Sequence, residues 1–329
     1  MKHATDAALS VEHLRTEFRI GGAWHAAVDD VSFDLAPRET LALVGESGCG
    51  KSVTALSIMG LVPVPQGRIG GGRILLEGRD LVGLREPALE KLRGDRVAMI
   101  FQEPMTSLNP VMTIGAQVAE SLVVHRGLSQ RAAEAKALAM LDEVKIPSAA
   151  RRFHDYPHQF SGGMRQRVMI AIALACEPIV LLADEPTTAL DVTIQAQVLG
   201  LLADLKERHG MAMLFITHNL GVVAQIADRV AVMYAGQIVE QAPVTEIFAR
   251  PAHPYTRALF AAIPRMDRDA QELAAIPGRV PPLDAMPSGC RFAARCPLAR
   301  EGCELPQVLT DVGGGHLARC WVATDIASD

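Results

Sequence analysis

The chain has 329 residues, of which 49% are apolar, and a formal net charge of −5 at pH 7. This length and apolar content are enough for one large α/β domain with a small appendage. The acidic balance, with no long run of lysine and arginine, argues against a nucleic-acid partner. The longest apolar stretch, near residues 168–183, is interrupted by Glu177 and Pro178, so we expect no membrane span. The N-terminal MKHATDAALS lacks the profile of a secretory signal, which favours a cytosolic chain.

A glycine-rich loop follows a short apolar strand that the pattern predicts. LALVG (residues 41–45) favours a short buried strand, GESGCGKS (residues 45–52) fits the phosphate-binding pattern G-x-x-x-x-G-K-[ST], and a helix is expected from Ser52 onward. Backbone amides of such a loop wrap phosphates, the lysine neutralises them, and the hydroxyl binds Mg²⁺. The predicted ATP-binding residues are Gly45, Glu46, Ser47, Gly48, Cys49, Gly50, Lys51 and Ser52.

Two later strands end in polar residues suited to phosphate chemistry. RVAMIF (residues 96–101) precedes Gln102, and the apolar run 179–183 ends in Asp184 and Glu185. Strands of an α/β sheet present their ligands at their carboxyl ends. We therefore expect Asp184 to hold Mg²⁺ through a water molecule and Glu185 to act as general base on the attacking water.

A helical region is expected between about residues 110 and 175. Within it, SQRAAEAKALAMLDEV predicts a helix that Ser129 caps. Ser161 is a second predicted cap, and Gly162 and Gly163 after it would expose amides at a helix N-terminus, which suits an anion. Strands are expected again at residues 213–217 and 229–236.

The segment SGGMRQ (residues 161–166) resembles the signature sequence of the ATP-binding subunits of ABC transporters, with Met164 where glutamine is more usual. The resemblance implies a P-loop ABC ATPase fold of the α/β class, with a RecA-like core sheet, an antiparallel β subdomain and a helical subdomain. It places the nucleotide-binding domain at residues 1–250 and the helical subdomain at about 105–175. It also implies that Ser161, Gly162 and Gly163 contact the γ-phosphate held by the opposite subunit.

Further site residues follow from the same resemblance. Gln102 matches the family's Q-loop glutamine, which senses Mg²⁺ and water, and His218 matches the switch histidine, which would bind the γ-phosphate. Asp191 matches the loop through which two subunits touch. The family stacks an aromatic ring on adenine, for which Phe18 is the first candidate and Trp24 the alternative, while apolar packing would explain either ring.

Residues 251–329, here called the C-terminal extension, contain many prolines, which predicts an irregular and extended segment. HPYTRALFAAIP (residues 253–264), IPGRVPPL and GCRFAARCP resemble the tail of the ATPases of dipeptide and oligopeptide importers, as does NPVMTIGAQVAES (residues 109–121). Relatives in that branch carry nickel, glutathione and other solutes. The resemblance covers nearly the whole chain and implies ATP-driven import of a small solute, most simply di- or oligopeptides.

Four of the six cysteines lie in this extension, at Cys290, Cys296, Cys303 and Cys320. In a cytosolic protein such a group favours metal ligation over disulfides. The residues alone leave zinc possible, although the tight C-x-x-C pairs of common zinc modules are absent, and four free thiols remain an alternative. The peptide-importer resemblance implies a [4Fe–4S] cluster on these four thiolates.

The resemblance also implies partners. They are a second ABC ATPase subunit, identical or not, two transmembrane permease subunits and, indirectly, an extracytoplasmic solute-binding protein. The chain would then dock at the cytoplasmic face of the inner or plasma membrane. A soluble ABC ATPase acting on the ribosome or on nucleic acid, an export ATPase and a regulatory ATPase are the rival functions, and the sequence does not name the solute.

Overall fold

The computed structural model describes residues 7–102, 107–188, 190–262 and 276–323. The chain folds as two compact units, each of which is assembled from separate segments of sequence. The first unit combines residues 1–9, 35–39 and 83–215, and the second combines residues 10–34, 40–82 and 216–329. This division does not follow the domain limits expected from the sequence, and those limits stay a prediction.

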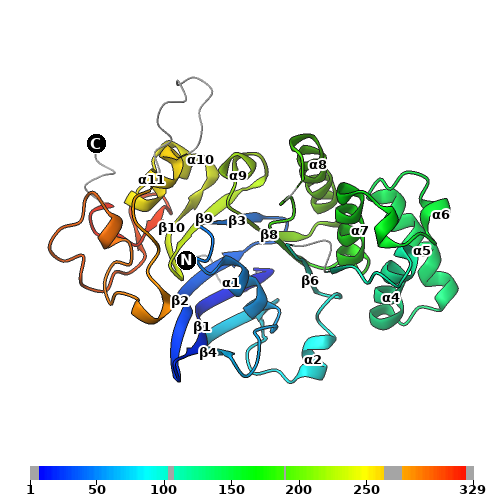
Figure 1. The fold of residues 1–329 in the computed structure, drawn as a ribbon, viewed down its shortest axis with the longest axis horizontal. Coiled ribbons are helices and arrows are strands. Elements are labelled where there is room, and N and C mark those ends of the chain that lie inside the picture. The colour runs from blue at the N-terminus through cyan, green and yellow to red at the C-terminus, as the bar shows by residue number, and fades with distance from the viewer. Residues whose placement is uncertain (1–6, 103–106, 189, 263–275, 324–329) are drawn as a thin grey trace. The chain divides into compact units, whose positions relative to one another are not determined.

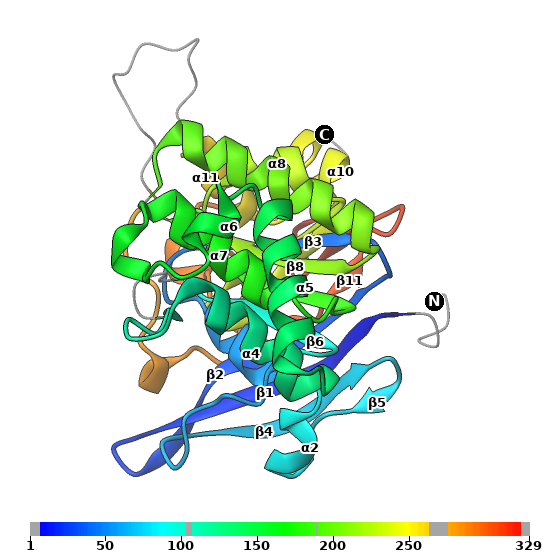
Figure 2. The same cartoon turned by 90° about the vertical axis from the view of Figure 1, so that its right-hand side faces the viewer.

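An antiparallel-type β layer opens the second unit. In the described part of the chain its strands are β1 (Leu9–Ile20), β2 (Ala23–Leu35), β4 (Gly67–Leu76) and β5 (Arg79–Asp80), and they lie in the order β2-β1-β4-β5. Figure 1 labels β1, β2 and β4, and Figure 2 also labels β5. Val31 and Phe33 of β2 are buried, whereas Ser32 and Asp34 between and after them are not. This alternation is what a sheet with one buried face requires.

The other sheet of the second unit carries the glycine loop. Its strands lie in the order β11-β12-β10-β9-β3, and β3 runs parallel to β9 while β9 and β10 are antiparallel. All five residues of β3 are buried, as its uninterrupted apolar sequence predicts. The bounds of these strands are β3 (Thr40–Val44), β9 (Arg229–Tyr234), β10 (Gln237–Pro243), β11 (Thr310–Asp311) and β12 (Leu317–Ala318).

The C-terminal extension is more ordered than its proline content suggests. It includes α11 (Pro254–Ala261) and two 3₁₀ turns, η2 (Leu283–Ala285) and η3 (Ala293–Arg295). It also adds strand β12 to the sheet, where Glu240 of β10 pairs with Ala318. Strands of two residues leave no alternating pattern in a sequence, so the irregular segment expected there carries a pairing that composition does not reveal. The remaining helices of the unit are α1 (Lys51–Ile58), α9 (Leu220–Ile226) and α10 (Val244–Ala249).

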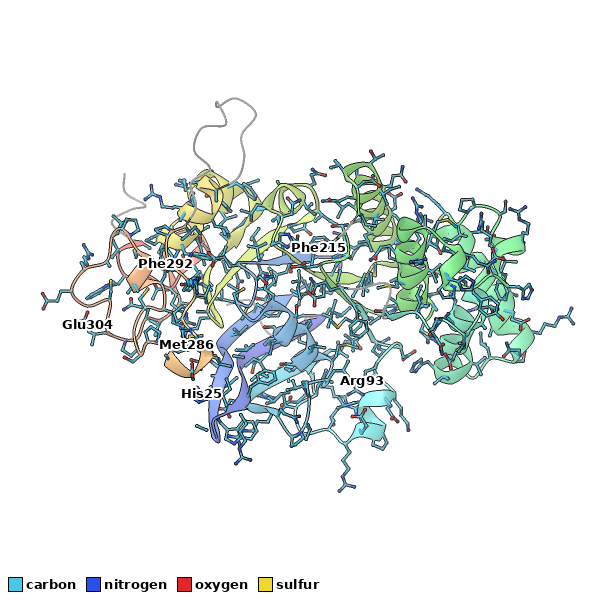
Figure 3. The ribbon with its side chains drawn as sticks, in the orientation of Figure 1. His25, Arg93, Phe215, Met286, Phe292 and Glu304 are labelled. Carbon is cyan, nitrogen blue, oxygen red and sulfur yellow. The ribbon has the colours of Figure 1, made fainter. Side chains whose placement is uncertain are left out.

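Aromatic side chains join the extension to the sheet of the second unit. Tyr234 of β9, Tyr255 of α11 and Phe292 are all fully buried in one core cluster. The ring centroids are 4.6 Å apart for Tyr234 and Tyr255, 5.3 Å for Tyr234 and Phe292, and 5.4 Å for Tyr255 and Phe292. Figure 3 labels Phe292, which the extension contributes. Such close aromatic pairs make the extension part of the core of this unit.

The described part of the first unit contains three strands and most of the helices. The strands lie in the order β8-β7-β6, with β6 (Val97–Ile100) parallel to β7 (Val180–Asp184), and β8 (Ala212–Thr217) continues into the second unit. Helix α4 packs against α5 and α7 (Figure 2). The helices are α2 (Glu86–Glu90), α4 (Ile114–Arg126), α5 (Gln130–Glu143), α6 (Ala149–Arg152), the 3₁₀ turn η1 (Pro157–Gln159), α7 (Gly162–Leu174) and α8 (Val192–His209).

Hydroxyl side chains cap the N-termini of α4 and α5. The Ser129 hydroxyl accepts a hydrogen bond from the Ala132 amide at 3.4 Å, so it caps α5 as expected. Thr113 caps α4 in the same way. Among the described residues, none of the helices combines the length and the apolar character needed to cross a bilayer.

Candidate nucleotide-binding site

The phosphate loop, residues 45–52, connects β3 to α1 in the second unit. Gly50 occupies the helix N-cap with φ of 109°, in the left-handed region. A Cβ atom at Gly50 would lie 2.9 Å from the Ala27 carbonyl oxygen and 2.7 Å from the Met233 methyl carbon. Both the backbone conformation and the close approach therefore require glycine here.

Lys51 begins α1, and its side chain folds back over the loop. Its Nζ donates to the carbonyl oxygens of Gly45 at 2.9 Å and of Glu46 at 3.1 Å, and only 5% of the residue is exposed. Within the described part of the chain no side chain caps the N-terminus of α1. Its first amides thus remain available to an anion, beside a buried ammonium group, while Ser52 is half-buried in the first turn.

Cys49 belongs to the loop and is buried. Only 1% of it is exposed, and burial raises the pKa of its thiol. A buried thiol of raised pKa is an apolar packing group at neutral pH.

The carboxylates lie at the carboxyl ends of the strands in the first unit. Asp184 is the last residue of β7 and is 4% exposed. Glu185 follows with φ of 47°, and its Oε2 accepts hydrogen bonds from Gln102 Nε2 at 3.0 Å and from the Thr188 hydroxyl at 2.9 Å. Strands β6 and β7 are in register, with Ile100 paired to Ala183, which brings the residues after both strands together.

The helix after the signature segment begins as the sequence predicts. Ser161 caps α7, and its hydroxyl accepts a hydrogen bond from the Met164 amide at 3.4 Å. A Cβ atom at Gly163 would lie 2.6 Å from Cγ2 of Ile194, so α8 packs directly on this turn. Gly162 has more space, since a Cβ atom there would only touch Leu190 at 3.9 Å.

Asp191 and His218 occupy loop positions in different units. The Asp191 carboxylate caps α8, because its Oδ1 accepts a hydrogen bond from the Ile194 amide at 2.9 Å. This gives Asp191 a local structural role in addition to the intersubunit contact expected from the sequence. His218 directly follows β8 and is exposed, and Asn219 after it caps α9.

The two candidate adenine-stacking rings lie in the antiparallel-type layer. The Phe18 ring packs against Gly67, since a Cβ atom at Gly67 would lie 2.9 Å from Phe18 Cε1. The Trp24 ring is covered on one side by the Arg68 guanidinium, 4.1 Å from the ring centroid. Arg68 is in turn paired with Glu17 at 2.8 Å. The choice of Phe18 for stacking stays a prediction.

The four cysteines of the extension influence one another. Burial and, to a smaller extent, the charges of Cys320, Cys303 and Cys296 raise the pKa of the Cys290 thiol to about 11, although a hydrogen bond from the Phe292 backbone opposes the shift. The Leu298 amide donates to Cys296 Sγ at 3.4 Å, and the Cys290 amide donates to the Cys303 carbonyl at 2.8 Å. However, the described residues hold no group of three or more cysteine, histidine or acidic side chains placed to bind a metal ion. The donor chemistry fits a soft metal, whereas these side chains, as they lie in the structure, form no metal site.

Comparison with known proteins agrees with this arrangement. The family model described as "ABC transporter" matches residues 28–188, and the model described as "Oligopeptide/dipeptide transporter, C-terminal region" matches residues 239–303. A putative peptide import ATP-binding protein of Brucella abortus (strain 2308) is 52% identical over 316 residues, which cover 96% of this chain and 95% of the relative. The chain belongs to the ABC transporter ATP-binding proteins of the oligopeptide/dipeptide family. A probable peptide ABC transporter ATP-binding protein of Sinorhizobium fredii is 52% identical over 325 residues, covering 98% of this chain and 97% of the relative.

Solved structures agree with the fold of this ABC ATP-binding protein. A dimeric ATP-binding cassette in a post-hydrolysis state with ADP and Pi has a TM-score of 0.64 and 27% identity, covering 72% of this chain and 98% of that one. A cassette from Clostridium perfringens, part of an ABC transporter complex, also has a TM-score of 0.64, with 25% identity and coverage of 74% and 91%. The expected P-loop ABC ATPase fold and the ATPase activity are thereby confirmed.

Three residues that the sequence did not indicate contact predicted site residues of this ABC ATP-binding protein. Thr188 holds Glu185, as described above. Tyr255 and Arg295, both in the extension, contact Glu46 of the phosphate loop. Thr188 follows Glu185 by three residues, a spacing at which a hydroxyl reaches back in a turn, whereas no sequence signal links Tyr255 or Arg295 to the loop.

Proposed function

We propose that this ABC ATPase is the ATP-hydrolysing subunit of a transporter that imports di- or oligopeptides. The observation that carries the proposal is the match over almost the full length of relatives named as peptide import ATP-binding proteins. The second support is the match of residues 239–303 to the oligopeptide/dipeptide C-terminal model. The nucleotide site described above supplies the chemistry that such a subunit needs.

ATP binds at the phosphate loop in this proposal. Amides of the loop other than that of Glu46, which donates to Tyr255, receive the phosphates together with the N-terminus of α1. Lys51 leaves its contacts with the loop carbonyls to neutralise the phosphates. The Ser52 hydroxyl and the Asp184 carboxylate are oxygen ligands of the kind that Mg²⁺ prefers. Mg²⁺, when bound, neutralises phosphate charge. Phe18 stacks on the adenine, with Trp24 as its alternative.

Hydrolysis depends on Glu185 in this proposal. Its carboxylate acts as the general base that takes a proton from the attacking water. The hydrogen bonds from Gln102 and Thr188 fix the position of its Oε2 atom and so orient the carboxylate for this step. His218 is the proposed γ-phosphate ligand.

The active assembly is proposed to be a dimer of ATPase subunits. Ser161, Gly162 and Gly163 of one subunit contact the γ-phosphate held by the other, and Asp191 lies near the contact. Amides at the start of α7 suit that anion because they carry the positive end of the helix dipole. Two permease subunits complete the transporter, and an extracytoplasmic solute-binding protein acts with them without contacting this chain directly. This chain docks at the cytoplasmic face of the membrane.

A [4Fe–4S] cluster on Cys290, Cys296, Cys303 and Cys320 is the finer proposal for the extension, with zinc as the alternative. Four thiols within electrostatic reach of one another support it. The four side chains form no metal site as they lie in the structure, so binding requires them to rearrange. Anaerobic purification followed by assays for iron, sulfide and zinc tests the proposal, and a metal-free protein with a folded extension contradicts it.

The transport proposal is tested by co-purification. A tagged Glu185→Gln variant is extracted from native membranes in mild detergent with ATP, and bound proteins are identified by mass spectrometry, with Lys51→Ala as the control that cannot retain ATP. Recovery of two permeases and a second ATPase with Glu185→Gln is the expected result. Peptide uptake is then compared between cells that contain the transporter and cells that lack it. Recovery of ribosomal or DNA-associated proteins without permeases contradicts import.

A further inference from the structure

The carboxylate of Glu46, the second residue of the phosphate loop, points to the C-terminal extension. Nη1 of Arg295 donates to its Oε2 at 3.0 Å, and Nη2 of Arg295 donates to its Oε1 at 3.1 Å. This is a bidentate ion pair, in which the planar guanidinium donates one hydrogen bond to each carboxylate oxygen. The Arg295 side chain is 6% exposed and that of Glu46 is 26% exposed, so the pair is shielded from water far more than a surface ion pair.

Arg295 is itself fixed by the surrounding structure. Its Nε donates to the Pro277 carbonyl at 2.8 Å, and its Nη2 also donates to the Ile276 carbonyl at 3.2 Å. The guanidinium lies over the ring of Tyr234, with its central carbon 5.7 Å from the ring centroid. A guanidinium with this many partners has one position, so the carboxylate that it holds has one position as well.

The backbone of Glu46 is held from the same side. Its amide donates to the Tyr255 hydroxyl at 2.9 Å, and Tyr255 is completely buried. Burial raises the pKa of the Tyr255 phenol, which therefore stays protonated. The ring packs on Tyr234 and Phe292, so the hydroxyl is presented to the loop by the aromatic cluster.

We infer that Arg295 and Tyr255 are positioning residues for ATP binding, through which the C-terminal extension shapes and neutralises the phosphate loop. Two physical effects are involved. Tyr255 and Arg295 hold Glu46 so that its amide and side chain are directed away from the loop's anion site. Arg295 also cancels the negative charge of Glu46, which would otherwise repel the phosphates of ATP from within the loop that must bind them.

This inference rests on ATP binding at the phosphate loop and does not depend on the transported solute. It makes a prediction that a purely structural role does not share. If Arg295 only anchors the extension, its loss cannot be repaired in the loop. If it neutralises Glu46, then removing the carboxylate charge repairs the loss.

The test compares ATP dissociation constants of the full-length protein, measured with Mg²⁺ by calorimetry, for Arg295→Ala, Glu46→Gln and the double variant. We expect Arg295→Ala to weaken ATP binding about tenfold, since it leaves an unneutralised carboxylate near the phosphates. The double variant Arg295→Ala with Glu46→Gln should recover most of that loss. Arg279→Ala, which removes an exposed arginine of the same extension, is the matched control and should bind ATP as the wild type does.

Two results overturn the inference. One is wild-type ATP affinity in Arg295→Ala, and the other is weakened binding that Glu46→Gln does not restore. Should Arg295→Ala fail to fold by circular dichroism, Arg295→Gln retains most of the side-chain stem and replaces it in the same comparison. A wild-type protein that binds no ATP, or a Lys51→Ala variant that binds it normally, would contradict the nucleotide site itself and is thereby distinguished from failure of the Arg295 inference.

Discussion

The catalytic carboxylate and the phosphate loop are held in place by different kinds of contact. Glu185 is fixed by Thr188, three residues further along the chain, and by Gln102 after the neighbouring strand. Glu46 in the phosphate loop is fixed by Tyr255 and Arg295, which lie 209 and 249 residues away in sequence. The first arrangement lies within the nucleotide-binding motifs, whereas the second depends on a segment outside them.

This difference separates the two steps of the reaction. Contacts to Glu185 act on the proton transfer, so their loss should lower kcat. Contacts to Glu46 act on the loop that receives the phosphates, so their loss should weaken the binding of ATP. A protein of this design can therefore have its binding step altered through the C-terminal extension while its hydrolytic group remains intact.

The largest expected effect comes from Glu185→Gln, which removes the general base and keeps the shape of the side chain. Turnover should fall by about 10²- to 10⁴-fold, while ATP still binds. Phosphate release and nucleotide retention on the purified protein measure the two properties. Hydrolysis at the wild-type rate would show that Glu185 is not the base. The contacts to Glu185 would then have no role in the hydrolytic step.

Thr188→Val deletes the hydroxyl that donates to Glu185 and keeps the β-branched shape. The loss of one hydrogen bond to a charged group should lower kcat about tenfold, with the KM for ATP little changed. Steady-state ATPase assays measure both constants. Thr193→Val, an exposed threonine in the same unit, is the control. Equal kcat values for the two variants would mean that Thr188 does not position the base.

Acid should destabilise the second unit through His253, which is buried and caps α11 by accepting a hydrogen bond from the Tyr255 amide at 3.0 Å. Burial lowers its pKa from 6.5 to about 4, although the charge of Glu240 opposes the shift. Between these values the unfolded chain binds more protons than the folded chain. The stabilisation is complete above pH 6.5 and is lost as the pH falls towards 4, by on the order of 3 kcal/mol.

The variant His253→Asn removes this titration but can still cap the helix. Chemical denaturation between pH 7.5 and pH 4.5 should give a flatter profile of the free energy of unfolding for His253→Asn than for the wild type. His154→Asn, at an exposed position, should keep the wild-type profile. Parallel profiles for wild type and His253→Asn would assign the acid sensitivity to other groups.

The smallest effect is expected from the loss of the Arg250–Glu246 ion pair, which, like Arg295–Glu46, joins an arginine to a glutamate but is exposed to solvent. Arg250 donates to Glu246 at 2.7 Å, but both side chains are largely exposed. Exposed pairs are screened by water and salt, so Arg250→Ala should leave ATP affinity and melting temperature unchanged. A loss of affinity as large as that of Arg295→Ala would mean that any arginine near the extension has this effect.

The motifs predicted much of the molecule because their physical requirements are local. Strand β3, the glycines of the loop, the Ser161 cap and the carboxylates at the end of β7 each follow from neighbours in sequence, and the structure has them as expected. The pairing of β12 with β10 and the contact of Arg295 with Glu46 join segments that are distant in sequence. Each involves only a few residues, so neither produces a periodic pattern in the sequence that could predict it. The group of four cysteines and the family resemblance suggested a metal, yet the arrangement of these side chains depends on how the extension folds.

The most direct measurement is a parallel determination of kcat and KM for ATP hydrolysis by the wild type, Thr188→Val and Arg295→Ala. Our account predicts that Thr188→Val lowers kcat with KM nearly unchanged, and that Arg295→Ala raises KM with the rate at saturating ATP nearly unchanged. If both substitutions alter the same constant, or if Arg295→Ala alters neither, then the extension does not control the phosphate loop and the separation of the two steps is wrong.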